Sequence, residues 1–533
     1  MLAQAAYHKA EQPIVSKDGR TRIIIDFFDE AYEAYPTALL RNFDLKTSTQ
    51  QPQVVALVQD YEKRYGFTRE SMTTWVGASV TAFLTPQQVE RLKADRNVRL
   101  LTEDQYATFS STPPISGWDP LMVIDWWNGG QWTERRDWGH KAVNGRVTTA
   151  TTTRKVYIID SGVAYHDDLP AMQRVNVACG TGGDCTNVSV GGQIGFYSQV
   201  GCYAHATHVA GIIGATVNNG KNRMGVYPGV QMVSVGTTTN NPAGSPPWSS
   251  CGSANPTMSA IGAAFDYIYL QNLPFTGGDR PVNVATMSIN FVGVGFVYGI
   301  AETNRPKLLK MVTPATLLSL WFGPLSYPGI FFTQSAGNQN DEACYLNGFG
   351  PVGSSGLVAA AFTTSPGATS TAVDGIMVVG AVKIDGQHAG PRFTAMEPRW
   401  LTQPGGSQFL TGDPGSNYGG CVDIWAPGDN TYSTWGKDVG STLGNVTYSG
   451  QQTSWFNFNQ NPSQAPNPTT VQGWQWLSGT SMAAPHVAAA AAYLADLNGL
   501  TSPIAIENAI RANWRYYGFV DPLGIPMMTL YLP

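Results

Sequence analysis

From Lys155 onward, short apolar runs alternate with stretches of helical character, and this alternation restricts the fold more than any other feature of the sequence. The apolar runs are rich in β-branched residues and lack a strict polar–apolar alternation, which is typical of strands buried on both faces. They occupy residues 156–159, 232–235, 282–289, 330–333 and 376–382. The helical stretches occupy residues 207–215, 256–270, part of 307–322, and 481–497. This order predicts an α/β domain over residues 151–533, with a mainly parallel sheet flanked by helices.

Residues 1–105 have a different order of elements and are predicted to form a separate small domain. Gly66 stands where a helix-ending glycine belongs, and Thr85, Pro86 and Gln88 make a capping box with proline at the first helical position. The expected elements are a strand at 22–27, a helix at 53–65, one or two strands within 74–84, a helix from 85 to about 95, and a strand at 98–102. This order predicts a small α+β domain of the ferredoxin-like type.

Two kinds of irregular region complete the chain. Residues 106–150 hold Pro113, Pro114 and a cluster of tryptophans, and we expect them to link the small domain to the start of the larger one. Three stretches rich in Gly, Pro, Ser and Asn, at about 345–372, 386–416 and 430–475, are too long for ordinary loops. We expect them to be surface insertions. Their tryptophans serve either local packing or a module that binds carbohydrate or surfaces.

Composition and cysteines bear on the compartment and on the partners of the chain. A net charge of −5 offers no electrostatic footprint for nucleic acid, and no apolar run reaches the length of roughly 20 residues that a membrane span needs. The N-terminal stretch MLAQAAYHKAEQ has no signal peptide, which fits either a cytosolic protein or a secreted one whose signal was replaced by a starting methionine. The six cysteines are even in number and contain no CxxC pair. We therefore expect disulfides and secretion.

Four polar residues at junctions between predicted elements could together make a site with a serine nucleophile. Such a nucleophile needs a base, a group that orients the base, and donors for the oxyanion. Asp160 ends an apolar run, His205 opens a helix of small residues, Asn338 follows a buried strand, and Ser481 opens an alanine-rich helix. Three of them have a plainer reading when taken alone: a turn for Asp160, a structural histidine for His205, as for His208, and a helix cap for Ser481.

Taken together, the segments DSG, HATHVAGIIGA, SAGN and SGTSMAAPHV, which begin at residues 160, 205, 335 and 478, resemble the subtilisin-like (subtilase) serine proteases and stand in that family's order. The order and the oxyanion asparagine are known features of subtilisin itself. The resemblance implies that Ser481 is the nucleophile, His205 the general base and then acid, and Asp160 the residue that orients His205. Asn338 and the backbone N–H of Ser481 would form the oxyanion hole. The implied function is a secreted serine endopeptidase that acts on proteins or peptides and needs no cofactor for catalysis.

The same resemblance implies which residues bind the substrate, and it exposes two departures from the family pattern. The implied substrate-binding residues are Ser288, Ile289, Asn290, Ser335, Ala336 and Gly337. The family has glycine where this chain has Ala206, and two glycines where it has Asn290 and Phe291. The glycines leave room for the substrate backbone to pair as an extra strand. We therefore expect a reshaped cleft, and the alternative function is a catalytically weak or silent protein that binds peptides.

Finer resemblance points to the proteinase K branch of the family. By that analogy we expect disulfides Cys202–Cys251 and Cys344–Cys421, which leaves Cys179 and Cys185 as a local pair, although six cysteines allow 15 connectivities. Asp423 matches a residue that binds calcium in some relatives, so a structural Ca²⁺ site at Asp423 is a further expectation.

The small N-terminal domain resembles the inhibitor-type propeptide of the same family. The resemblance lies in the segment WVGASVTAFLTPQQVERLKADRNVRLLTED, residues 75–104. It implies that this domain assists folding, then inhibits the active site from within the same chain, and is cut off afterwards. The stretch from Tyr106 to Ser111 would then thread the active site, and the protein would be a self-processing precursor.

Overall fold

The computed structural model describes the elements of both predicted domains but not every connection between them. The described residues are 5–10, 13–35, 50–106, 108–109, 123–124, 127–128, 131–132, 135–163, 166–177, 200–219, 223–237, 256–273, 281–290, 297–319, 323–338, 340, 373–384, 393–395, 400–402, 408–410, 415–429, 431–436, 446–448, 451–453 and 472–533. Most of the three expected insertions, including nearly all of 345–372, therefore lies outside the described residues.

The N-terminal domain is a five-stranded sheet with three helices. Its elements are β1 (Ala6–His8), β2 (Thr21–Phe27), α1 (Asp29–Glu33), α2 (Pro52–Tyr65), β3 (Arg69–Thr73), β4 (Ser79–Leu84), α3 (Pro86–Lys93) and β5 (Val98–Glu103). The strand order is β1-β5-β2-β4-β3, with β1 parallel to β5 and the other neighbours antiparallel. The expected strands and helices of this region are confirmed, and the stretch 74–84 contributes β4 while β3 lies just before it.

Local signals explain why the helices of this domain begin and end where they do. Thr85 accepts a hydrogen bond from the backbone of Gln88, whose side chain accepts one from the Thr85 backbone in return, so the predicted capping box is present. Gly66 ends α2 in the left-handed conformation, with φ of 70°, as a helix-ending glycine should. These caps need only residues close in the chain, so they could be found without a structure.

The second domain is built on a ten-stranded sheet. Along its main path the order is β12-β13-β11-β14-β18-β19-β23-β29-β28, and all neighbours from β12 to β29 are parallel. These strands are β11 (Lys155–Asp160), β12 (Gln173–Asn176), β13 (Gln231–Gly236), β14 (Asn283–Met287), β18 (Ile330–Ser335), β19 (Ile376–Ile384), β23 (Ile424–Pro427), β28 (Arg515–Val520) and β29 (Pro526–Thr529), with β20 (Phe393–Ala395) beside β19. The predicted mainly parallel sheet is confirmed.

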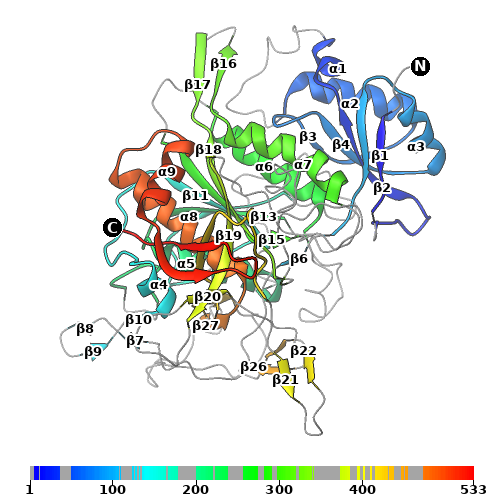
Figure 1. The fold of residues 1–533 in the computed structure, drawn as a ribbon. Coiled ribbons are helices and arrows are strands. Elements are labelled where there is room, and N and C mark those ends of the chain that lie inside the picture. The colour runs from blue at the N-terminus through cyan, green and yellow to red at the C-terminus, as the bar shows by residue number, and fades with distance from the viewer. Residues whose placement is uncertain are drawn as a thin grey trace.

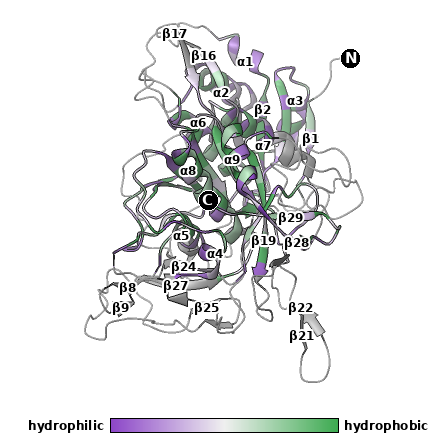
Figure 2. Ribbon diagram, turned by 60° about the vertical axis from the view of Figure 1, so that its left-hand side comes forward, coloured by the Kyte–Doolittle hydropathy of each residue, from purple (hydrophilic) through white to green (hydrophobic). Residues whose placement is uncertain are grey.

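Helices cover both faces of this sheet, because the apolar side chains of each strand point alternately to either side. In β11, Val156 and Ile158 belong to one core with α5 (Val200–Gly214), α8 (Thr480–Leu497) and α9 (Pro503–Asn513). Tyr157 and Ile159 belong to the other core, with α6 (Met258–Gln271) and α7 (Val297–Val312). Figure 1 shows the helices on either side of the strands, and Figure 2 shows hydrophobic residues gathered in these central elements. None of the helices in the described part is long and apolar enough to span a membrane.

The remaining elements are short and lie around the two main sheets. They are α4 (Trp138–Ala142) and the two-stranded pairs β6 (Thr108–Phe109) with β15 (Ile289–Asn290), β7 (Val123–Ile124) with β10 (Arg135–Arg136), β8 (Trp127–Asn128) with β9 (Gln131–Trp132), β16 (Ala315–Ser319) with β17 (Gly323–Tyr327), β21 (Trp400–Thr402) with β22 (Gln408–Leu410), β24 (Thr431–Gly436) with β27 (Gln472–Leu477), and β25 (Val446–Tyr448) with β26 (Gln451–Thr453). β24 packs against α5 and pairs with β27, so both ends of the expected insertion 430–475 belong to the body of the domain.

The structure gives the bounds of two expected helices, and only the first differs from what was expected. The helix expected at 207–215 begins earlier, at Val200, so His205 lies within α5 and not at its start. The stretch 307–322 is helical only as far as Val312, and Pro314 then precedes the strand β16. Pro314 fits this boundary, since proline disfavours helical geometry in the residue before it, while α7 accommodates Pro306 in its interior.

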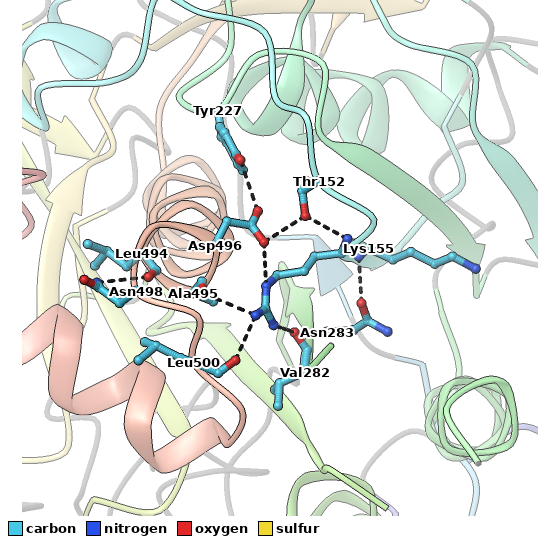
Figure 3. A network of polar contacts seen from close by, with 11 residues as sticks. Thr152, Lys155, Tyr227, Val282, Asn283, Leu494, Ala495, Asp496, Asn498 and Leu500 are labelled. Atoms are coloured by element: carbon cyan, nitrogen blue, oxygen red, sulfur yellow. Dashed lines mark hydrogen bonds and ion pairs between the residues drawn. The ribbon is translucent and has the colours of Figure 1, made fainter. Parts of the chain in front are cut away.

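A buried arginine ties the end of α8 to the start of β11. The Arg154 guanidinium donates to the carboxylate of Asp496 at 2.6 Å and to the carbonyl oxygens of Ala495 and Leu500 at 3.2 and 2.8 Å. The same carboxylate accepts hydrogen bonds from Thr152 and Tyr227 (Figure 3). A cation at a helix C-terminus is favourable because it faces the negative end of the helix dipole. α8 carries Ser481 in its first turn, and β11 ends at Asp160. This contact therefore joins two elements that carry candidate site residues.

The two domains pack against one another through α6 and α7. In β2, Ile23 and Ile25 point into the core of the N-terminal domain, while Ile24 points into the core that contains α6 and α7. The Asp266 carboxylate of α6 accepts hydrogen bonds from the backbone N–H groups of residues 74–76, at 2.5 to 3.0 Å. Lys307 of α7 forms an ion pair with Asp26 at 3.2 Å. Figure 1 shows the N-terminal domain beside these two green helices.

Candidate active site

Asp160 and His205 are in direct contact in the structure. Asp160 is the last residue of β11 and is fully buried, and His205 lies in α5 with 7% of its surface exposed. The His205 Nδ1 atom lies 2.8 and 2.9 Å from the two carboxylate oxygens of Asp160. The backbone N–H of Ser161 also donates to Asp160 Oδ1, at 2.6 Å. A carboxylate that holds Nδ1 in this way selects the tautomer in which Nε2 is available as a base.

The local sequence around His205 explains how α5 approaches the sheet closely. Ala206 is fully buried and belongs to the core under α5, and its backbone N–H donates to the Ser161 hydroxyl at 3.3 Å. The methyl group that replaces the family's glycine therefore packs into the core. A β-carbon built on Gly211 would lie only 2.3 Å from the hydroxyl oxygens of Ser433 and Thr434, so the next turn of α5 has no room for a larger residue.

Ser481 lies in the first turn of α8, which packs against α5. Its hydroxyl donates to the carbonyl oxygen of Ser288 at 3.2 Å, and the Ser288 hydroxyl donates to the Ser481 carbonyl oxygen at 3.1 Å. This reciprocal pair links the start of α8 to the residue between β14 and β15. The first N–H groups of a helix have no partner inside it and carry a partial positive charge, which suits an anionic oxygen placed there.

Asn338 also lies next to the start of α8. Its side-chain oxygen accepts hydrogen bonds from the backbone N–H of Thr480 at 2.9 Å and from the Thr480 hydroxyl at 2.8 Å. The backbone N–H of Gly337 donates to the same hydroxyl at 3.0 Å. These contacts turn the amide oxygen toward the start of α8. The structure thus brings Asn338 and the residue before Ser481 together, and the role of Thr480 is one that the sequence did not single out.

Of the expected substrate-binding residues, Ile289 and Asn290 pair with another part of the same chain. They form β15, which is antiparallel to β6, with Ile289 opposite Phe109 and Asn290 opposite Thr108. Just before β6, Tyr106 forms a bridge with Thr257. The strand on which substrate was expected to pair is therefore occupied by the segment that follows the N-terminal domain. Phe291 lies outside the described residues.

Residues 335–337 lie at and just after the end of β18, and they are hydrogen-bonded to neighbouring parts of the same chain. The backbone N–H of Ala336 donates to Val379, its carbonyl oxygen accepts from the Asn417 side chain, and the Gly337 carbonyl oxygen accepts from the Asn417 backbone. Ser335 is buried at the end of β18. A role of these residues in substrate binding stays a prediction.

The expected disulfides and calcium site are described only in part. Cys421 is disulfide-bonded, and no free cysteine is found among the described residues. The side chains of Cys179, Cys185, Cys202, Cys251 and Cys344 lie outside the described part, so the expected pairings stay predictions. Asp423, the expected calcium ligand, is hydrogen-bonded to the Val378 backbone and paired with Arg511.

A second buried polar cluster lies close to α5 and α8 and was not found from the sequence. Arg223 is fully buried, pairs with Asp137 at 2.9 Å, and donates to the carbonyl oxygen of Tyr432. Burial, together with the charge of Arg223, lowers the pKa of His140 to about 3. Burial also lowers the pKa of His486, in α8, to about 4. Both imidazoles are therefore neutral at ordinary pH and take part in packing rather than in proton transfer.

Comparison with known proteins settles the family. The sequence profile described as the subtilase family matches residues 152–514, which is more than half of the chain. The chain belongs to the subtilase family. This subtilase is 31% identical over 162 residues to subtilisin-like protease 2 of Pseudogymnoascus destructans, a match that covers 30% of this chain and 32% of that protein. It is also 31% identical over 149 residues to the cuticle-degrading protease of Metarhizium anisopliae, which covers 28% of this chain and 30% of the relative.

The matched regions thus span about a third of these two relatives. The fold of this subtilase is also similar to a solved structure, that of fervidolysin from Fervidobacterium pennivorans, described as a keratinolytic enzyme related to subtilisin. The TM-score is 0.57, at 17% sequence identity, and the match covers 99% of this chain and 62% of fervidolysin. This similarity supports the subtilisin-like fold, which was expected from the sequence.

Proposed function

We propose that this subtilase is a serine endopeptidase with Asp160, His205 and Ser481 as its catalytic triad. The observation that carries the proposal is the contact of His205 Nδ1 with both carboxylate oxygens of Asp160, at the end of β11, in a chain of this family. Ser481 opens the helix that packs on the helix of His205, and Asn338 is held beside it by Thr480. No cofactor is needed, since these groups supply a nucleophile, a base and an electrophilic site.

In the proposed reaction the Ser481 hydroxyl attacks the carbonyl carbon of the substrate while His205 Nε2 takes its proton. Asp160 stays ionised and stabilises the imidazolium cation that forms. The negative charge on the former carbonyl oxygen is stabilised by the Asn338 amide nitrogen and by the backbone N–H of Ser481. His205 then protonates the amine of the leaving peptide as the C–N bond breaks, which leaves an acyl-enzyme. A water molecule, deprotonated by His205, hydrolyses this ester and restores Ser481.

We propose further that the N-terminal domain is an inhibitory propeptide and that the chain is a self-processing precursor. The support is the pairing of β6 with β15, which puts the protein's own residues 108–109 along the strand expected to bind substrate. The domain is held over α6 and α7 by buried polar contacts at Asp266 and Lys307. We propose cleavage a short way after Phe109, because this segment lies along β15 next to Ser288, whose carbonyl oxygen accepts a hydrogen bond from the Ser481 hydroxyl.

Secretion belongs to the same proposal. The disulfide at Cys421 is the supporting observation, since disulfides form and persist in oxidising compartments. The proposed partners are protein or peptide substrates and the chain's own N-terminal domain.

The decisive experiment compares the purified precursor with its Ser481→Ala variant. We expect the parent to cut itself shortly after Phe109, which mass spectrometry would detect as a new N-terminus, while the variant stays at full length. Removal of a triad serine typically lowers kcat by about 10⁶-fold, a value measured on subtilisin itself. Normal self-cleavage of the variant would exclude Ser481 as the nucleophile.

The alternative function, a peptide-binding protein without catalysis, is tested separately with a fluorophosphonate probe. An activated serine reacts covalently with this reagent, whereas an inert one does not. We expect labelling of the processed protein at Ser481 and none in the Ser481→Ala variant. A folded protein that neither cuts itself nor takes up the probe would support the alternative.

A further inference from the structure

The likeness to proteinase K-type relatives implies a calcium ion at Asp423, and the atoms around this carboxylate decide whether an ion fits there. Asp423 directly precedes β23, and its largely buried side chain contacts β19 and α9. Its Oδ2 atom accepts a hydrogen bond from the backbone N–H of Val378 at 2.9 Å. Its Oδ1 atom accepts one from Nη2 of Arg511 at 3.1 Å. Both oxygens therefore face N–H donors.

A calcium ion does not fit this arrangement. Ca²⁺ takes six to eight oxygen ligands, whereas each oxygen of Asp423 already uses a lone pair for an N–H donor, and the Arg511 cation at Oδ1 repels a second cation. The neighbouring carboxylate of Glu507 is also used: Oε2 accepts from the N–H groups of Asp374 and Gly375 at 3.0 and 2.8 Å. Within the described part of the chain, no three His, Cys, Asp or Glu side chains come together as metal ligands.

We propose that the Arg511 guanidinium takes the place of a metal ion at Asp423, so that this part of the subtilase is held together without calcium. Arg511 lies in the last turn of α9 and joins two carboxylates. It contacts Asp423 Oδ1 at 3.1 Å, and Glu507 Oε1 through Nε at 2.8 Å and Nη2 at 2.6 Å. The ring of Trp514 lies 5.3 Å from its central carbon, in cation–π geometry.

The chemistry of arginine suits this role better than that of lysine. The guanidinium is planar, stays charged at any pH that the fold tolerates, and presents several N–H donors in fixed directions. It can therefore bind two carboxylates on different elements at once, as a divalent ion would. Through Glu507 the contact extends to the turn before β19, so that one side chain connects α9, the start of β23 and residues 374–375. Calcium chelation should leave this connection intact.

The test measures thermal unfolding in the full-length Ser481→Ala background, which prevents self-digestion. Asp423→Asn keeps the size of the side chain and removes the charge that a cation would need. We expect the change in Tm between excess chelator and millimolar Ca²⁺ to be the same with and without Asp423→Asn, because any calcium effect would arise elsewhere. A calcium-dependent rise in Tm that Asp423→Asn abolishes would overturn the proposal.

A double-mutant cycle tests the role given to Arg511. Arg511→Met should lower the Tm by on the order of 5 °C, since it leaves two carboxylates without their cation. The loss should be clearly smaller when Asp423→Asn is already present, because the two residues interact directly. Arg515→Met removes an exposed charge four residues further on and leaves both carboxylates paired, so it is the control; it loses only a cation–π contact with Tyr531, and we expect a smaller effect.

Equal losses from Arg511→Met in both backgrounds would show that Arg511 does not neutralise Asp423, and would overturn the proposal. Should Arg511→Met fail to fold, Arg511→Lys serves instead. It keeps the charge but cannot reach two carboxylates with the same geometry, so we expect an intermediate loss that Asp423→Asn again reduces.

Discussion

At the scale of single residues, the candidate site depends on side chains that fix one another's direction. The Asn338 amide could point either way along its axis, but both hydrogen bonds from Thr480 reach its oxygen. These bonds determine which end of the amide faces Thr480. In the same way, the two contacts of Asp160 with Nδ1 determine which nitrogen of His205 can act as a base.

We predict that Asn338→Ala lowers kcat by about 10²–10³-fold and changes KM little, because the lost donor matters mainly in the transition state. Steady-state kinetics on a peptide substrate with the processed enzyme measure both values. Thr480→Val is the companion variant: it keeps the shape, and the backbone N–H of residue 480 still orients Asn338, so we expect a smaller loss. A loss of Asn338→Ala that lies only in KM would assign this residue to ground-state binding.

How far the sequence could predict this site depends on how far apart along the chain the contacting residues lie. Asp160, His205, Asn338 and Ser481 were recognised because each lies in a short motif whose residues are neighbours in the chain. The contacts of Ser481 with Ser288, 193 residues away, and of Asn338 with Thr480, 142 residues away, were not. They arise only when α8 packs against the ends of β14 and β18, and no local pattern reports that packing.

At the scale of elements, β2 shows how one strand serves two cores. Its three consecutive isoleucines point alternately to the helices of its own domain and to α6 and α7. The sequence predicted this strand, and the caps predicted α2 and α3, because those signals are local. It did not predict that the outer face of the sheet is covered by α6 and α7. Nor did it predict the hydrogen bonds of Asp266 and the ion pair of Lys307 with the N-terminal domain.

We predict that Lys307→Met weakens the attachment of the N-terminal domain by on the order of 100-fold or more. Lys307 is only 4% exposed and pairs with Asp26, which is also buried. Without the ammonium group Asp26 keeps the longer contact with Arg99, at 3.7 Å, but loses Lys307, and removing one partner of a buried pair typically costs about 3–5 kcal/mol.

The measurement titrates separately produced N-terminal domain against the processed enzyme and follows inhibition of peptide hydrolysis. Lys310→Met, in the same helix but exposed, removes the same charge and should leave the affinity close to that of the parent. An equal effect of the two substitutions would mean that the overall charge of α7, and not the pair with Asp26, governs the attachment.

At the scale of the whole molecule, the stability of this subtilase should depend on pH through its buried histidines. Burial holds the pKa of His140 at about 3 and that of His486 at about 4 in the folded state, against roughly 6.5 in an unfolded chain. Unfolding therefore takes up protons below pH about 6.5. The stability that the protein gains from keeping these histidines neutral is fully present above that pH. It falls as the pH drops toward 4.

Each of these histidines should reduce the free energy of unfolding by up to about 1.4 kcal/mol per pH unit over that range. Burial raises the pKa of Asp266 to about 6, and this carboxyl acts with the opposite sign, so a single pH curve would not separate the groups. The test is a difference: denaturant unfolding of His486→Gln and of its parent, both with Ser481→Ala. The deficit of the variant should shrink as the pH falls from 6.5 to about 4.5. A deficit that is the same at every pH would contradict the prediction.

The pairing of β6 with β15 has a consequence for when the proposed inhibition ends. While the chain is continuous, the blocking segment is tethered to the strand that it covers, and its effective concentration there is in the millimolar range, whatever the volume around the molecule. Once the bond after this segment is cut, the same contact becomes an encounter between two separate molecules. Its occupancy then follows ordinary mass action and falls on dilution. A protease of this kind would stay inhibited while the cleaved N-terminal domain is concentrated around it. It would become active on dilution.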